Sequence, residues 1–192
     1  MLYESRTDLD EIWVIARRED RLQELQSELG STVIPVAFDI TDGSSVEKYV
    51  KLLKDKQATV KLLINNAGFG KLGNFDKLSL QDNTRMVRLN CEALTAMTAA
   101  TLPFMNEHSE IINSCSIASF APNTRMAVYS STKAYVMSLS RALRAELKPR
   151  KINVLAVCPG PMSTEFLAIA NIERGSSKTF DTLPRVNPHI MA

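Results

Sequence analysis

The chain has 192 residues, of which 45% are hydrophobic and 23% charged, which is ordinary for a globular domain with a substantial core. Its net charge is +2 without a dominant basic or acidic run, which argues against nucleic acid as the main ligand. No apolar stretch is long enough to span a membrane, and residues 1–10 are too polar for a signal peptide. We therefore expect neither a nucleic-acid partner nor a membrane partner.

Three cysteines, Cys91, Cys115 and Cys158, are widely spaced and lie in apolar segments. An odd number at such spacing favours buried free thiols in a reducing compartment, so the sequence predicts a cytoplasmic protein. Methionine, cysteine and histidine are too scattered to indicate a metal site.

Short apolar runs alternate with amphipathic segments along the chain. The predicted strands are 11–16, 33–38, 60–64, 110–113 and 152–158. The predicted helices are 19–29, 44–55, 82–105, 127–147 and a short one from 164 to about 170. Gly30 and Pro149 mark helix ends, and Ser44 and Ser45 are candidate caps for the second helix.

This alternation, with strands that are nearly continuous apolar runs, predicts an α/β fold with a parallel sheet covered on both faces. In such a sheet, ligands bind beyond the carboxyl ends of the strands. The residues that follow predicted strands are polar or glycine: Arg17, Asp39, Asn65, Asn66, Ser116 and Gly160.

Tyr129 and Lys133 lie four residues apart on a predicted helix, so they share one face. A phenol has an ordinary pKa of about 10, and a nearby ammonium lowers it. With the Ser116 hydroxyl to hold a substrate oxygen, the pair suits proton transfer during hydride transfer. The alternative is an interfacial tyrosine beside a lysine that extends its ammonium to solvent.

Taken together, several short motifs resemble the short-chain dehydrogenase/reductase family, from about Asp10 to Glu165. They occur in the family's order and spacing: Asp39, Asn65-Asn66-Ala67-Gly68, Asn90, Ser116, Tyr129-x-x-x-Lys133 and Pro159-Gly160. The resemblance implies a Rossmann-like, doubly wound sheet in three layers. It also implies a homodimer or homotetramer formed through the two long helices.

The resemblance implies a catalytic set of four residues. Tyr129 would be the general acid in reduction and the general base in oxidation. Lys133 would lower the Tyr129 pKa and hold the nicotinamide ribose, and Ser116 would orient the substrate oxygen. Asn90 would support a water that links Lys133 to solvent. The implied reaction transfers a hydride between a nicotinamide cofactor and a small carbonyl or secondary alcohol.

A cofactor-binding set follows from the same resemblance. Besides Tyr129 and Lys133, it consists of Asp39, Ile40, Asn66, Ala67, Gly68, Pro159, Gly160 and Thr164. Asp39 would accept from the adenine amino group, and the segment from Pro159 to Thr164 would bind the carboxamide. Ordinary turn chemistry at strand ends is the alternative for Asp39 and for Pro159-Gly160.

Arg17 and Arg18 follow the first predicted strand. An acidic residue in this region binds the ribose hydroxyls of NAD, whereas arginine accommodates the additional phosphate of NADP. We therefore predict NADP rather than NAD. The alternative is that both arginines are solvated residues near a helix start.

The family's glycine-rich pyrophosphate loop is not visible in the sequence. Gly68-Phe-Gly70-Lys-Leu-Gly73 matches G-x-G-x-x-G, but no helix opens within its glycines, as pyrophosphate binding requires. We expect the natural molecule to have roughly thirty further N-terminal residues that supply the first strand and this loop. Residues 1–192 are accordingly predicted to be a single Rossmann-like domain, incomplete at both ends.

A second function remains open, in which the chain is an inactive relative or fragment that serves as a scaffold or subunit. The Ser116, Tyr129 and Lys133 set favours the enzyme. Four apolar residues near the expected pocket predict an apolar substrate body, although each could equally fill a core gap: Phe69, Phe120, Met162 and Phe166.

Overall fold

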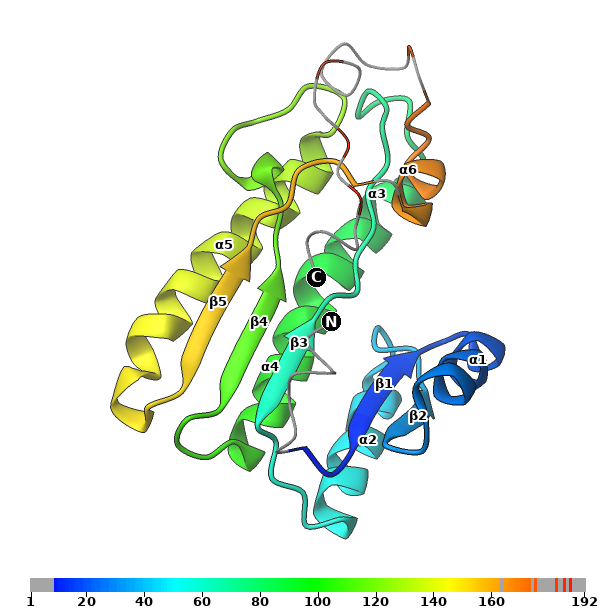
Figure 1. The fold of residues 1–192 in the computed structure, drawn as a ribbon. Coiled ribbons are helices and arrows are strands. Elements are labelled where there is room, and N and C mark those ends of the chain that lie inside the picture. The colour runs from blue at the N-terminus through cyan, green and yellow to red at the C-terminus, as the bar shows by residue number, and fades with distance from the viewer. Residues whose placement is uncertain are drawn as a thin grey trace. The chain divides into compact units, whose positions relative to one another are not determined.

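The computed structural model describes residues 9–162 and 164–173 and the single positions 175, 182, 185 and 187. The chain divides into two compact units, Met1–Gln57 and Ala58–Ala192, and each is described by itself (Figure 1). In both units parallel strands alternate with helices, which confirms the predicted α/β class.

The first unit contains a two-stranded parallel sheet and two helices. Its elements are β1 (Ile12–Ala16), α1 (Glu19–Leu29), β2 (Val33–Ala37) and α2 (Gly43–Asp55). The two strands pair in register from Ile12 opposite Val33, and α1 connects them as a crossover helix. α2 packs against β1 through an edge-to-face contact between the rings of Tyr49 and Trp13, with centroids 6.4 Å apart.

The ends of the two helices follow local chemistry. Gly30 ends α1 at φ +93°, a conformation that favours glycine, and its N–H donates to the carbonyl of Gln26. The prediction that Ser44 or Ser45 caps α2 is wrong, because Asp42 is the cap and its Oδ1 accepts from the N–H of Ser44 at 3.2 Å. A carboxylate there also interacts favourably with the helix dipole.

The second unit is built on a three-stranded parallel sheet in the order β3–β4–β5. The strands are β3 (Leu62–Asn65), β4 (Glu110–Ser114) and β5 (Asn153–Val157). The α-helices are α3 (Leu80–Val87), α4 (Leu94–Thr101), α5 (Ala127–Glu146) and α6 (Glu165–Ile169). The π- and 3₁₀-helical segments are η1 (Arg88–Ala93), η2 (Leu102–Phe104), η3 (Ile117–Ser119) and η4 (Lys148–Arg150).

Figure 1 shows α4 and α5 along the same face of this sheet. Packing on that face is dense: Ile111 of β4 and Val136 of α5 have no exposed surface. Side chains alternate along a strand, so Ile64 and Leu155 point away from these helices, and each is 46% exposed. None of the helices in the described part of the chain is both long enough and apolar enough to cross a membrane.

The helix predicted over 82–105 is in fact a helical run of several types from Leu80 to Phe104. Its start is sharp, because the Ser79 hydroxyl accepts from the N–H of Asp82 at 2.9 Å. The six residues Arg88–Ala93 form a π-helix, η1. Such segments are rare and often lie at functional sites, and this one contains Asn90.

Candidate active site

A cavity of about 610 Å³ lies at the carboxyl ends of the strands in the second unit. Ser116 follows β4, Pro159 and Gly160 follow β5, and Tyr129 and Lys133 come from the first turns of α5. The predicted site residues that line the cavity are Asn66, Gly68, Ser116, Tyr129, Lys133, Pro159, Gly160 and Thr164.

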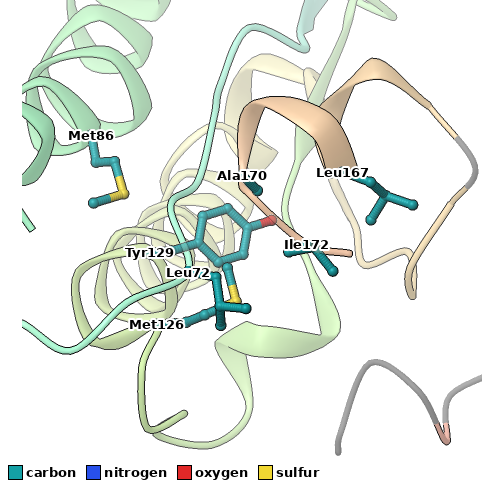
Figure 2. Close-up of a cluster of buried hydrophobic side chains, with 7 residues drawn as sticks. All are labelled: Leu72, Met86, Met126, Tyr129, Leu167, Ala170 and Ile172. Carbon is teal, nitrogen blue, oxygen red and sulfur yellow. The ribbon is translucent and has the colours of Figure 1, made fainter. Parts of the chain in front are cut away.

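Tyr129 is the central side chain of this cavity and is 8% exposed. Its ring packs against the ring of Phe166 from α6, with centroids 5.5 Å apart and planes at 51°. Figure 2 shows the ring within a cluster of buried apolar side chains. That cluster comprises Leu72, Met86, Met126, Tyr129, Leu167, Ala170 and Ile172.

The sequence predicts that Lys133 lowers the pKa of Tyr129, whereas in the structure the Tyr129 pKa is raised. Burial of the phenol raises the Tyr129 pKa above its ordinary value, and a hydrogen bond with the Ser116 side chain only partly offsets this effect. The Lys133 Nζ donates to the carbonyl of Ser114 at 2.6 Å. The phenol of this structure is therefore protonated at neutral pH.

Lys133 is itself buried, which lowers its pKa from the ordinary value. Its Nζ lies 5.9 Å from the centroid of the Tyr129 ring, over the ring face. An ammonium at this position can act on the phenol electrostatically and can donate to other acceptors in the cavity.

Asn90 lies outside the cavity lining but is bonded to a segment that borders the cavity. Its Nδ2 donates to the carbonyl of Phe69 at 2.9 Å and to Thr132 Oγ1 at 3.0 Å, and its Oδ1 accepts from the N–H of Phe69 at 3.0 Å. A Cβ on Gly68 would lie 3.0 Å from this Oδ1 and 3.5 Å from Lys133 Nζ. Asn90 thus holds the backbone that runs past Lys133.

A buried polar network next to the site is barely visible in the sequence. Asn65 Nδ2 donates to Asn113 Oδ1 at 2.8 Å and to Thr98 Oγ1 at 2.9 Å, and Asn113 Nδ2 donates to Ser140 Oγ at 2.9 Å. These bonds tie β3 and β4 to α4 and α5. Of the residues in this network, only Asn65 can be recognised from the sequence, as part of the Asn65-Asn66-Ala67-Gly68 motif.

Ala67, also predicted to bind the cofactor, is exposed in the second unit and does not line the cavity. The other predicted cofactor residues lie in the first unit, where the strands end. Arg17 Nη1 and Asp39 Oδ2 are 3.9 Å apart, and Asp39 Oδ1 accepts from the Thr41 hydroxyl at 2.6 Å. The bond from Thr41 is the largest cause of a lowered Asp39 pKa, with a smaller effect from Arg17. Arg17 and Arg18 are exposed, whereas Ile40 is half-buried.

The residues around the cavity fit the nicotinamide end of a dinucleotide. The Lys133 ammonium and the Tyr129 and Thr164 hydroxyls supply hydrogen-bonding groups on the cavity wall. Gly160 leaves the backbone open to close approach, because the nearest atom to a Cβ at this position would be 3.9 Å away.

Comparisons with known proteins agree with this fold. The family model described as "short chain dehydrogenase" matches residues 7–174. A relative from Haemophilus influenzae, a "Probable NADP-dependent dehydrogenase", is 36% identical over 92% of this chain and 72% of its own length.

Two solved structures are also similar. The closed form of a serine dehydrogenase complexed with NADP+ has a TM-score of 0.83 and 30% identity, over 94% of this chain and 75% of that one. A short-chain dehydrogenase from Sphingobium yanoikuyae in complex with NADPH has a TM-score of 0.78 and 32% identity, over 92% of this chain and 69% of that one. The chain belongs to the short-chain dehydrogenase family, which confirms the predicted Rossmann-like fold and the oxidoreductase class.

Proposed function

We propose that this chain transfers a hydride between NADP and a small carbonyl or secondary alcohol, with Tyr129 as the general acid and base. The observation that carries the proposal is the convergence of Ser116, Tyr129 and Lys133 on one cavity, where the Ser116 side chain partly offsets the raised pKa of the Tyr129 phenol. A hydroxyl beside a protonated phenol is the arrangement needed to bind a carbonyl oxygen and protonate it.

The bound nicotinamide supplies or accepts the hydride. In reduction, the Ser116 hydroxyl holds the substrate oxygen, and the Tyr129 phenol gives its proton to that oxygen. Burial keeps this proton on the phenol until charge develops on the substrate. The Lys133 ammonium then stabilises the phenolate that remains, and oxidation uses the same residues in reverse.

The NADP assignment draws on Arg17 and Arg18, which are exposed at the carboxyl end of β1. Guanidinium groups suit a phosphate because they donate parallel hydrogen bonds. The names of the Haemophilus influenzae relative and of the serine dehydrogenase structure both include NADP, which supports the same assignment. Asp39 would contact the adenine end, close to the Arg17 guanidinium.

The cavity walls favour a substrate with an apolar body. Leu72, Met126 and Leu167 line the cavity beside Tyr129, and Phe166 and Met162 close it from the segment around α6. Of the four predicted residues, Phe69 packs behind the site against the buried cluster, and Phe120 is 69% exposed.

We further propose that two copies of the chain associate through the outward faces of α3 and α5. Leu80 and Val87 on α3 are 81% and 47% exposed, and Tyr135 on α5 is 42% exposed. The Tyr135 hydroxyl lies 2.8 Å from Thr95 Oγ1 of α4, which joins α5 to the helical run that begins with α3. Exposed apolar side chains on such a face are typical of an interface.

The three cysteines are free, with Cys91 and Cys115 buried and Cys158 half-buried. Free thiols support the proposal of a reducing, cytoplasmic location.

A panel of ketones and aldehydes, assayed by the loss of NADPH absorbance, tests the proposed reaction. We expect turnover with at least one apolar ketone, and binding of NADPH in preference to NADH by fluorescence titration. Binding of NADPH without turnover of any member would favour the alternative of an inactive subunit. Absence of NADPH binding would contradict the proposed cofactor.

A further inference from the structure

The segment Gly68–Gly73, which matches a dinucleotide fingerprint only by its glycine spacing, is hydrogen-bonded on both sides beside the active site. Both backbone groups of Phe69 are bonded to the Asn90 side chain. Further along, the N–H of Leu72 donates to the carbonyl of Ala170, at the end of α6, at 2.9 Å. The segment therefore joins the π-helix η1 to α6.

The same segment is also bonded to the loop that leads into α5. The N–H of Gly73 donates to the carbonyl of Arg125 at 2.8 Å, and Arg125 has a left-handed backbone with φ +64°. Four residues later in the chain, α5 presents Tyr129. The segment thus contacts both α6, which carries Phe166, and the loop that leads into α5, which carries Tyr129.

Gly70 lies against the side chains of Tyr129 and Phe166. A Cβ on Gly70 would lie 2.9 Å from Tyr129 Cδ2 and 3.0 Å from Phe166 Cζ, which is closer than ordinary van der Waals contact allows. The rings of Tyr129 and Phe166 are themselves in contact. A side chain at position 70 therefore requires at least one of the two rings to move.

We propose that Gly70 and Phe166 are positioning residues, which together set the orientation of the Tyr129 phenol relative to Ser116. This inference rests on the proposed role of Tyr129. Neither residue reaches the reacting atoms; both act through the tyrosine ring. Figure 2 shows Leu72 from this segment and Ala170 from the end of α6 near the ring, and Leu167 belongs to the same buried cluster.

The consequence is that a small change at α6 is transmitted to the catalytic phenol. A misplacement of about 1 Å in a catalytic group can cost roughly 100-fold in rate. The backbone bond between Leu72 and Ala170 makes the segment and α6 shift together.

Gly70→Ala, with Gly73→Ala as its matched control, tests the proposal. At Gly73 a Cβ would meet Leu78 Cδ2 at 2.7 Å, which is the far end of a flexible side chain rather than an aromatic ring. We expect Gly70→Ala to lower kcat by roughly 10- to 100-fold with the KM for NADPH unchanged, and Gly73→Ala to retain kcat. Equal kcat values for the two variants would overturn the proposal.

Phe166→Leu provides a second test that does not add volume, with Ile169→Ala as control, since Ile169 is on the same helix and 47% exposed. We expect Phe166→Leu to lower kcat and Ile169→Ala to leave it unchanged. Thermal unfolding of each variant identifies any that fails to fold. If Gly70→Ala does not fold, the comparison of kcat between Phe166→Leu and Ile169→Ala tests the proposal.

An NMR measurement separates this inference from the proposed function. The chain has four tyrosines, so the ring signals of labelled protein are few, and Tyr129→Phe identifies the signal of Tyr129. We expect Gly70→Ala to shift that signal and Gly73→Ala to leave it in place; an unshifted signal in both variants overturns the inference. If the signal shifts but Tyr129→Phe retains turnover, the contact stands and the proposed function fails.

Discussion

Lys133 Nζ donates a hydrogen bond to the carbonyl oxygen of Ser114 and is not bonded to the Tyr129 phenol. The distance of 2.6 Å marks a strong charge-assisted bond. Burial is the largest influence on the Tyr129 pKa and raises it above its ordinary value. The Tyr129 phenol is therefore protonated and can act as a general acid.

The first prediction concerns the titration of Tyr129 in the protein without cofactor. Its folded-state pKa is raised above the ordinary value of 10.0, so its contribution to stability is present below that value and is lost as pH rises through the folded pKa. The phenolate absorbance of wild type minus that of Tyr129→Phe should show a midpoint above 10.0. A midpoint near neutral pH would contradict the structure.

Asn90→Ala should destabilise the fold by about 1–3 kcal/mol, because both backbone groups of Phe69 lose their partner. Asn83→Ala is the matched control on the same helical run: its Nδ2 makes a 3.3 Å bond to the Phe75 carbonyl, and its buried Oδ1 has no partner among the described residues. Urea unfolding should show the larger loss for Asn90→Ala. Equal losses would mean that the bonds to Phe69 contribute little.

Asp42→Ala should lower the unfolding free energy of the first unit, since Asp42 accepts from the N–H of Ser44 at the start of α2. Ser44→Ala removes only the hydroxyl that donates to Asp42 Oδ2 and should cost less. Hydrogen exchange of the α2 amides measures both. Faster exchange of the α2 amides in Ser44→Ala than in Asp42→Ala would indicate that Ser44, and not Asp42, is the cap of α2.

Arg17→Ala should weaken NADPH binding by roughly tenfold or more, because a charge-assisted hydrogen bond contributes about 1.5–3 kcal/mol. NADH binding should change little. Arg21→Ala is the control, since Arg21 already forms an ion pair with Glu24 at 3.0 Å on α1. Fluorescence titration with both cofactors gives the comparison, and parallel losses for NADPH and NADH would argue against a phosphate contact.

Much of this fold is visible in the sequence because strands buried on one or both faces are apolar runs. All five predicted strands occur within two residues of their predicted bounds. The helical spacing of Tyr129 and Lys133, and the polar residues at strand ends, also predict which residues of the second unit share the cavity.

Other features depend on tertiary contacts that have no local signature. Nothing in Arg88–Ala93 distinguishes a π-helix from an α-helix, and the partner of Lys133 is a backbone carbonyl on another element. Gly70 resembled a nucleotide-binding glycine by pattern alone. Its contact with Tyr129 and Phe166 becomes apparent only once three distant segments are brought together.

The most direct test of the central claim is the kcat of Tyr129→Phe compared with that of Tyr135→Phe, a second tyrosine on the same helix that contacts Thr95 instead of the cavity. Loss of a general acid lowers the rate by about 10²- to 10⁴-fold. The account predicts such a loss for Tyr129→Phe with NADPH binding retained, and wild-type turnover for Tyr135→Phe. Undiminished turnover in Tyr129→Phe would contradict it.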